Sequence, residues 1–309
     1  MEIIEKIAVM QETSEKWRRD GALIVLVPTM GFLHEGHVEL LRVGRQKGDK
    51  LIMSLFVNPA QFGPQEDYQT YPSDTEGDFE KARSVGVDAV FMPTADEMYP
   101  DRSQTTVNVE EITQYLCGES RPGHFAGVTT VVAKLFNITK PHLAIFGEKD
   151  YQQLVVIKQM VRDLDMDIDI LGVPTVREQD GLAMSSRNNY LSAEERVSAL
   201  SLKKGLDLAS ALVATGEKDA GKIKNSVREL ILNHPFTEID YITICDPEKL
   251  TDIERVDGPC LLALAVRVGK ARLIDNITLR KRRGTGNQPN LRLPEEKRGK
   301  TRERKKRVA

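Results

Sequence analysis

Short apolar runs recur along the first half of the chain, and a stretch with helical periodicity separates each run from the next. The runs cover residues 23–27, 51–57, 89–92, 143–146 and 168–173. Strands that are apolar at nearly every position are typical of a parallel sheet buried on both faces, and their alternation with helices is typical of a doubly wound α/β fold. The pattern therefore predicts a Rossmann-like parallel-sheet domain over residues 1–178.

The pattern changes after residue 178. Two helical stretches, 193–214 and 217–233, precede three further apolar runs, at 241–245, 261–268 and 271–277. Gly269 and Lys270 join the last two runs and predict a tight β-hairpin turn. We therefore expect a smaller α+β domain over residues 179–281.

The end of the chain differs in charge from the rest. The whole chain has a formal net charge of -2, but residues 280–309 contain thirteen Lys or Arg and three Asp or Glu. Basic residues mixed with Pro, Gly and Asn, without periodicity, predict a disordered tail over residues 282–309. Nucleic-acid binding by this tail is an alternative function, although we expect no nucleic-acid partner.

Hydrophobicity and cysteine content indicate the cellular compartment in which the protein is expected to work. No run of eighteen apolar residues is present, and the first residues lack the basic and apolar segments of a secretory signal. The three cysteines, Cys117, Cys245 and Cys260, have no spacing typical of a zinc site or a redox dithiol. We therefore expect a cytoplasmic protein with reduced thiols and no membrane segment.

Two histidines follow the first predicted strand, where a helix begins. His34 and His37 lie three residues apart within residues 27–37. A helix start at the carboxyl end of a parallel strand offers free backbone N–H groups to an anion, and imidazoles can stabilise the charge of a phosphorus transition state. Two histidines at this spacing are also common as ordinary surface or packing residues. Zinc-protease chemistry is excluded, because it needs histidines four residues apart on an established helix.

Two further polar segments are suited to a nucleotide. In the first, Gly147 allows close backbone approach, Lys149 offers a positive charge to phosphate, and Asp150 can accept from a ribose hydroxyl. Gln153 lies one helical turn later and should face the same crevice. The second segment, 181–188, combines hydroxyls with a guanidinium that can hold pyrophosphate oxygens. A solvated turn and an interdomain linker are the alternative interpretations of these two segments.

Five segments resemble, in order, those of the pantothenate synthetase family, which belongs to the nucleotidylyltransferase superfamily. They are residues 28–37, 56–62, 121–125, 146–150 and 184–188, and the likeness covers nearly all of residues 1–280. The resemblance implies ATP-dependent condensation of pantoate with β-alanine, which releases AMP and pyrophosphate through a pantoyl adenylate. It also implies Mg²⁺ as the companion of ATP, a homodimer, and a mobile lid over residues 121–125.

The resemblance assigns roles to individual residues. Catalytic roles fall to His34, His37, Lys149 and Arg187. The same four residues would bind ATP together with Met30, Gly31, Gly147, Asp150, Val176, Met184, Ser185 and Ser186. Gln61 and Gln153 would hold pantoate, with Gln61 also near β-alanine. Asp78 is the candidate Mg²⁺ ligand, and a charge at a helix start is its alternative role.

The two glutamines also bear on the nearest alternative activity, a nucleotidyltransferase that acts on a phosphate-bearing substrate. Amide side chains both donate and accept hydrogen bonds, which suits a substrate with hydroxyls and a carboxylate. A phosphate-bearing substrate calls for a cluster of basic residues instead. Gln61 and Gln153 therefore favour an unphosphorylated acid.

Overall fold

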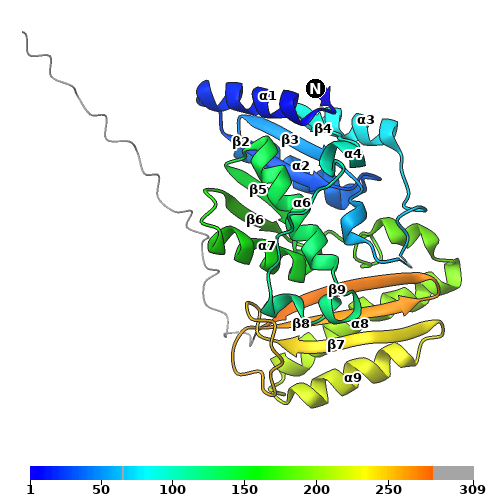
Figure 1. Cartoon of the computed structure of the whole chain (residues 1–309). Coiled ribbons are helices and arrows are strands. Elements are labelled where there is room, and N and C mark those ends of the chain that lie inside the picture. Colours follow the sequence, from blue (N-terminus) through cyan, green and yellow to red (C-terminus); the bar gives the residue numbers. More distant parts are fainter. Residues whose placement is uncertain (65, 281–309) are drawn as a thin grey trace, which may run out of the picture.

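The computed structural model describes residues 1–64 and 66–280, which form two domains, one above the other in Figure 1. The N-terminal domain is a parallel sheet with helices on both faces. Its strands are β1 (Glu2–Ile4), β2 (Ile24–Thr29), β3 (Lys50–Leu55), β4 (Ala89–Phe91), β5 (Leu143–Gly147) and β6 (Asp169–Val173). Its α-helices are α1 (Ile7–Arg19), α2 (Glu35–Lys47), α3 (Thr75–Val85), α4 (Ala95–Met98), α5 (Cys117–Ser120), α6 (His124–Thr139) and α7 (Tyr151–Asp163).

The sheet has the strand order β1-β4-β3-β2-β5-β6, and every pairing is parallel. Consecutive side chains of a strand point to opposite faces of the sheet. On β2, Ile24 and Leu26 pack with residues of α1, α6 and α7, whereas Val25 and Val27 pack with residues of α2 and α3. Burial on both faces explains why the strands are continuous apolar runs in the sequence.

The C-terminal domain packs two long helices against a three-stranded antiparallel sheet. Its elements are α8 (Ala193–Ala214), α9 (Ala220–Leu232), β7 (Thr237–Cys245), β8 (Cys260–Val268) and β9 (Ala271–Leu279), and the strands are ordered β7-β8-β9. The hydrophobic core of the N-terminal domain ends at Val173, and that of the C-terminal domain begins at Leu182. The change of core therefore falls between these two residues.

The predicted fold class is confirmed, because a parallel sheet precedes a smaller α+β domain. The predicted hairpin is also present: Val268 pairs with Ala271, and Gly269 has a φ of 56°, in the left-handed region that favours glycine. One strand escaped prediction, because β1 has only three residues and pairs with β4 at the edge of the sheet. The predicted tail, 282–309, lies outside the described residues.

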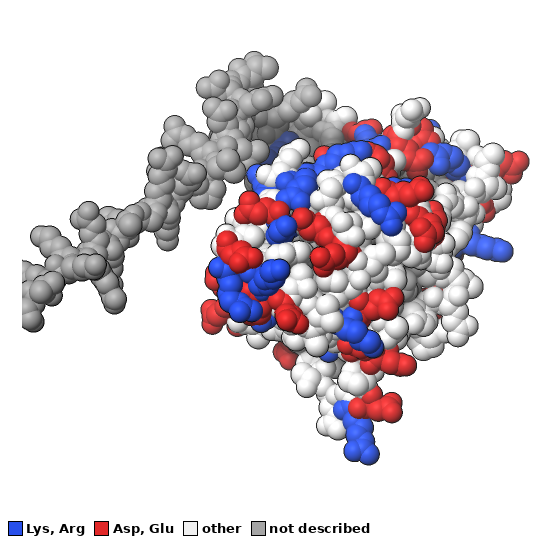
Figure 2. Space-filling model, turned by 90° about the horizontal axis from the view of Figure 1, so that it is seen from above, with Lys and Arg blue, Asp and Glu red and all other residues white. Residues whose placement is uncertain are grey.

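The charge of the surface is relevant to nucleic-acid binding, and the length and hydrophobicity of the helices are relevant to membrane insertion. Figure 2 shows one face of the molecule, on which Lys and Arg side chains lie among Asp and Glu side chains. Nucleic-acid binding favours a continuous patch of Lys and Arg side chains, and the face shown in Figure 2 has no such patch. Within residues 1–64 and 66–280, no helix is both long and apolar enough to cross a membrane.

Candidate active site

A cavity of about 250 Å³ lies at the carboxyl ends of β2, β3 and β5, beside the first turns of α2 and α7. This is where open α/β sheets bind their ligands. Most of the residues selected from the sequence line it: Met30, His34, His37, Gln61, Gly147, Lys149, Asp150, Gln153, Val176, Met184, Ser185, Ser186 and Arg187. Gly31 and Asp78 are not among the lining residues. The structure thus gathers, around one cavity, residues from parts of the chain that are far apart in the sequence.

The first junction, residues 29–37, connects β2 to α2 through a turn with unusual backbone angles. Gly31 has a φ of 85° and Phe32 a φ of 50°, and the left-handed region is unfavourable for a phenylalanine. Asp78 of α3 stabilises this turn, because its carboxylate accepts from the backbone N–H of Phe32 at 2.8 Å and of Leu33 at 2.6 Å. A Cβ on Gly31 would lie 3.0 Å from Asp78 Oδ2, so glycine is also needed for space.

The sequence predicts Asp78 as a Mg²⁺ ligand, which stays a prediction, and in this structure its carboxylate contacts the backbone of the first junction. Its side chain is buried, with the residue 1% exposed, and both oxygens are engaged by the backbone of the first junction. Burial raises the pKa of this carboxyl, and the two backbone hydrogen bonds act in the opposite direction. In this arrangement the carboxylate positions the turn that carries Met30 and His34.

His34 and His37 are stacked, with ring centroids 4.0 Å apart. His34 precedes the first residue of α2, and its backbone N–H donates to His37 Nδ1 at 3.3 Å. Because Nδ1 accepts, the proton of a neutral His37 is on Nε2. Burial lowers the pKa of His34 to about 4, and burial followed by the charge of His34 lowers the pKa of His37 well below its ordinary value. At neutral pH both rings are therefore uncharged hydrogen-bond donors rather than cations.

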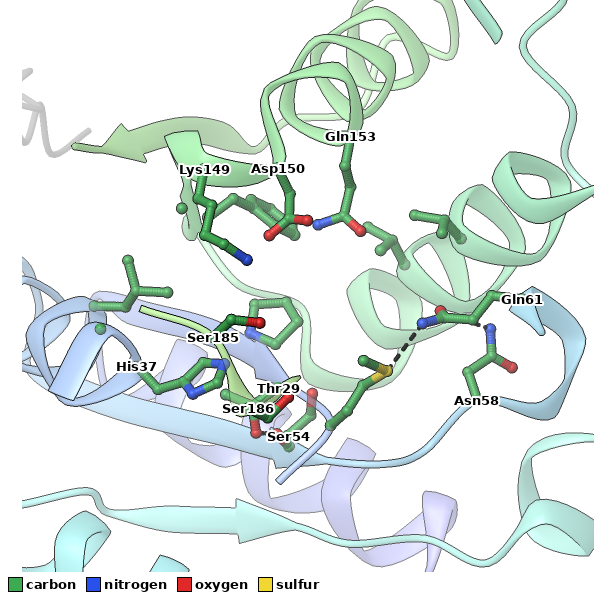
Figure 3. A pocket seen from close by; sticks show the side chains of 18 of the residues that line it. Thr29, His37, Ser54, Asn58, Gln61, Lys149, Asp150, Gln153, Ser185 and Ser186 are labelled. Atoms are coloured by element: carbon green, nitrogen blue, oxygen red, sulfur yellow. Dashed lines mark hydrogen bonds between the residues drawn. The ribbon is translucent and has the colours of Figure 1, made fainter. Parts of the chain in front are cut away.

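The second junction, residues 147–153, runs from β5 through the short helix η3 (Glu148–Asp150) into α7. A Cβ on Gly147 would meet no protein atom within 4 Å, so a ligand can approach the backbone closely there. Figure 3 shows Lys149, Asp150 and Gln153 on the side of the cavity opposite His37. Gln153 and Asp150 line the same cavity, as their spacing predicts.

The third segment of the cavity wall, residues 176–187, closes the cavity between the domains. The backbone N–H of Met184 donates to Val176 O at 3.0 Å, and the Ser185 hydroxyl accepts from Arg187 N at 3.3 Å. The Arg187 guanidinium makes a bidentate ion pair with Asp67, at 2.8 and 3.1 Å. Burial acts to lower the pKa of Arg187, but the Asp67 carboxylate raises it above the ordinary value. A phosphate that binds Arg187 must therefore compete with Asp67, a residue that the sequence did not single out.

The far end of the cavity holds uncharged polar groups. Gln61 lies in the short helix η1 (Pro59–Gln61), and its Nε2 donates to Met30 Sδ at 2.9 Å. Asn58, 1% exposed, donates to Gln61 Oε1 at 3.2 Å and accepts from the Tyr99 hydroxyl at 2.8 Å. Asn58 thus holds one of the predicted acid-binding glutamines (Figure 3). It escaped notice as an individual residue, although it lies in the conspicuous segment that follows β3.

The expected lid, residues 121–125, is tied down by polar contacts in this structure. Arg121 makes an ion pair with Glu66, with Nε to Oε1 at 2.6 Å and Nη2 to Oε2 at 2.7 Å. His124 Nδ1 lies 2.7 Å from the backbone oxygen of Gln61, and burial lowers the pKa of this histidine to about 4. A neutral His124 donates this bond. Movement of the segment stays a prediction.

Comparison with known proteins gives a consistent result. The family model described as pantoate-beta-alanine ligase matches residues 2–278. The pantothenate synthetase of Caldicellulosiruptor bescii is 54% identical over 279 residues, which are 90% of this chain and 99% of that relative. The crystal structure of pantothenate synthetase from Thermus thermophilus has a TM-score of 0.84 and 41% identity, covering 90% of this chain and 99% of that one. The Francisella tularensis pantoate-beta-alanine ligase complexed with beta-gamma ATP and beta-alanine has a TM-score of 0.73 and 34% identity, covering 90% and 97%.

Proposed function

The chain belongs to the pantoate–β-alanine ligase family, and from that premise we propose that it condenses pantoate with β-alanine. ATP drives the reaction and leaves as AMP and pyrophosphate, and pantoyl adenylate links the two steps. One observation carries the proposal for this chain. A single cavity joins a phosphate-binding end, around His37 and Lys149, to an end that offers the amide side chains of Gln61 and Gln153.

In the first step a carboxylate oxygen of pantoate attacks the α-phosphorus of ATP, and pyrophosphate leaves. Negative charge on the phosphoryl oxygens must be stabilised as this happens. His34 and His37 donate hydrogen bonds as neutral imidazoles, and Lys149 supplies positive charge from the opposite side of the cavity. Arg187 exchanges Asp67 for pyrophosphate oxygens, which keeps the guanidinium paired throughout.

The remaining nucleotide contacts follow from the same segments. The open backbone at Gly147 lets the nucleotide approach the end of β5, and Asp150 accepts from a ribose hydroxyl. Val176 and Met184, joined by a backbone hydrogen bond, form the wall on the other side, together with Ser185 and Ser186.

The acid end suits pantoate, which has two hydroxyls and a dimethyl-substituted carbon in addition to its carboxylate. Gln61 and Gln153 can donate to and accept from the hydroxyls and the carboxylate. Helix α6 adds an apolar wall for the dimethyl carbon, formed by Val128, Val131, Val132 and Leu135. A phosphate-bearing acid would bind less well at this end, because its arginine, Arg121, is already paired with Glu66.

In the second step the amine of β-alanine attacks the acyl carbonyl, a C–N bond forms, the amine releases a proton, and AMP leaves. No covalent enzyme intermediate is needed, because the adenylate is already an activated acyl donor. Exclusion of water protects that adenylate from hydrolysis, and this is the use we assign to a lid at residues 121–125.

Mg²⁺ enters this scheme as the companion of the ATP phosphates, whose charge it neutralises. Mg²⁺ usually keeps several waters and binds substrate phosphates with few protein ligands. Within the described part of the chain, no group of three or more His, Cys, Asp or Glu side chains could hold a metal. That finding is compatible with an ion held mainly by phosphate oxygens and water.

We also propose a cytoplasmic homodimer. The family resemblance supports the dimer, and three free cysteines, two of them buried, suit a reducing compartment. Sedimentation of the purified protein tests the dimer, since a single species of monomer mass at micromolar concentration would contradict it. Cell fractionation tests the location.

The decisive test of the reaction is ATP–pyrophosphate exchange with pantoate present and β-alanine absent. Exchange under these conditions establishes both the acid substrate and the adenylate step. Exchange without pantoate, or exchange that requires β-alanine, would contradict the proposal. Salt-sensitive RNA binding without any exchange would favour the nucleic-acid alternative.

A further inference from the structure

The second junction is held by a residue of the other domain. Asn276 of β9 donates from Nδ2 to the backbone oxygens of Glu148 at 3.0 Å and Lys149 at 2.9 Å. One amide group therefore spans two successive carbonyls of η3, the turn that carries Lys149 and Asp150 into the cavity. An amide nitrogen has two hydrogens, so both bonds can form at once.

The neighbouring residue on the same strand holds the third segment. Asp275, 3% exposed, makes a bidentate ion pair with Arg177, with Asp275 Oδ2 to Nη1 at 2.7 Å and Oδ1 to Nη2 at 2.9 Å. Arg177 directly follows Val176, and its Nη1 also donates to Gly181 O at 3.2 Å. Adjacent strand residues point to opposite sides, so β9 reaches one active-site segment with each side chain.

We propose that Asn276 is a positioning residue for adenylation, which acts by fixing the turn that aims Lys149 at the phosphates. This inference rests on the proposed function. Lys149 itself belongs to the N-terminal domain, but its backbone is anchored by an amide from the C-terminal domain. Asp275 complements this role at the 176–184 loop. The second domain thus helps to build the catalytic geometry in addition to closing one side of the cavity.

Loss of a positioning contact can reduce the reaction rate far more than the strength of the contact itself would suggest. A displacement of about 1 Å at a catalytic group can cost a hundredfold in rate. Loss of both hydrogen bonds frees the turn, so Lys149 no longer points where charge develops. Amide formation from ready-made pantoyl adenylate develops no charge on the α-phosphorus, so it depends much less on this lysine.

The informative substitution is Asn276→Asp, which keeps the shape of the side chain, removes both donated bonds and places a carboxylate against two carbonyls. We expect adenylation, measured by pantoate-dependent ATP–pyrophosphate exchange, to fall about 10-fold to 100-fold. Amide formation from supplied pantoyl adenylate should fall by no more than about threefold. Asn276→Ala, which adds no charge, should follow the same pattern and carries the test if Asn276→Asp does not fold.

Asn137→Asp is the matched control. Asn137 also donates from its amide to a backbone carbonyl, Ala133 O at 2.9 Å, but it lies on α6 and does not line the cavity. This variant should keep the activity of the parent protein. A loss in Asn137→Asp equal to that in Asn276→Asp would contradict a specific role of Asn276.

A double-mutant comparison separates positioning from simple adhesion between the domains. If Asn276 acts through Lys149, its substitution should cost much less in a Lys149→Ala background than in the parent. The same fold-loss in both backgrounds, or equal losses in the two half-reactions, would overturn the proposal. Absence of exchange in the parent protein would overturn the proposed function, whereas an active parent with a fully active Asn276→Asp would overturn this inference alone.

Discussion

The two strand–helix junctions that face the cavity share a topology but are held in place by different parts of the molecule. β2 and β5 are adjacent parallel strands, and each leads into a helix whose first turn lines the cavity. At the first junction the backbone is fixed by Asp78, a buried residue of the same domain. At the second junction it is fixed by Asn276, a residue of the other domain.

This difference divides the site into a part that the N-terminal domain completes alone and a part that depends on docking of the second domain. The apolar cluster between the domains is small, with five buried members: Leu116, Cys245, Leu250, Leu261 and Ala263. Modest interfaces between domains permit relative movement. We therefore expect the histidine side of the cavity to keep its geometry when the interface is disturbed, and the lysine side to lose it.

The largest effect should come from the first junction. His37→Ala removes a donor to the charge that develops at the α-phosphorus, commonly worth about 3–4 kcal/mol, or a hundredfold to a thousandfold in rate. Turnover should fall far more than ATP affinity, because the interaction is strongest in the transition state. The measurement compares adenylation with amide formation from supplied pantoyl adenylate, while circular dichroism checks the fold. Equal losses in both steps would indicate general positioning of the adenylate instead.

A smaller effect is expected from the two glutamines that would bind pantoate. Gln61→Ala and Gln153→Ala each leave polar groups of pantoate without partners, at a cost of about 1–3 kcal/mol. Pantoate affinity should weaken while ATP affinity stays close to that of the parent. Calorimetric titration with each ligand measures both. Normal pantoate affinity and turnover in both variants would place the acid pocket elsewhere.

Asp78→Asn tests whether the first junction is held from within its own domain. The isosteric amide keeps one accepting oxygen and loses the charge, so the free energy of unfolding should fall by about 2 kcal/mol. Adenylation should fall about tenfold as the turn loosens. The Mg²⁺ concentration that gives half-maximal activity should not change.

The control for this substitution is Asp246→Asn. The Asp246 carboxylate also accepts from two successive backbone N–H groups, of Glu248 and Lys249, but in a turn of the C-terminal domain. This variant should keep full adenylation activity. If Asp78→Asn instead needed several times more Mg²⁺, the carboxylate would be a metal ligand, as the family resemblance implies.

The sequence predicts the parts of this comparison that depend on local pattern. Apolar runs indicate the strands, and the residues that follow them, such as His37 and Lys149, are chemically conspicuous. Asp78 is noticed from the sequence only as a candidate metal ligand, and Asn276 is not noticed at all. Their contacts are with backbone atoms 45 or more positions away in the chain. Asp67 is hidden for the same reason, since its partner Arg187 is 120 positions away. Periodicity carries no information on such contacts.

The smallest effect concerns stability in acid, and it arises at the first junction. The pKa of His34 is lowered to about 4 in the folded protein, from an ordinary value of 6.5. Between these values the unfolded chain binds more protons than the folded one, so stability is present above pH 6.5 and is lost as the pH falls towards 4.

His34→Gln removes this contribution. The free energy of unfolding of this variant and of the parent is measured by urea titration at pH 7.5 and at pH 5. The decrease between the two pH values should be smaller in the variant, by about 1–2 kcal/mol. Gln153→Ala, which changes the second junction without removing an ionisable group, is the matched control and should show the same fall as the parent. Equal falls in all three proteins would mean that His34 is not held neutral by its surroundings. His34 would then titrate near its ordinary pKa of 6.5, and the first junction would gain positive charge in mildly acidic solution. The division between a neutral donor side and a charged lysine side would then fail below that pH.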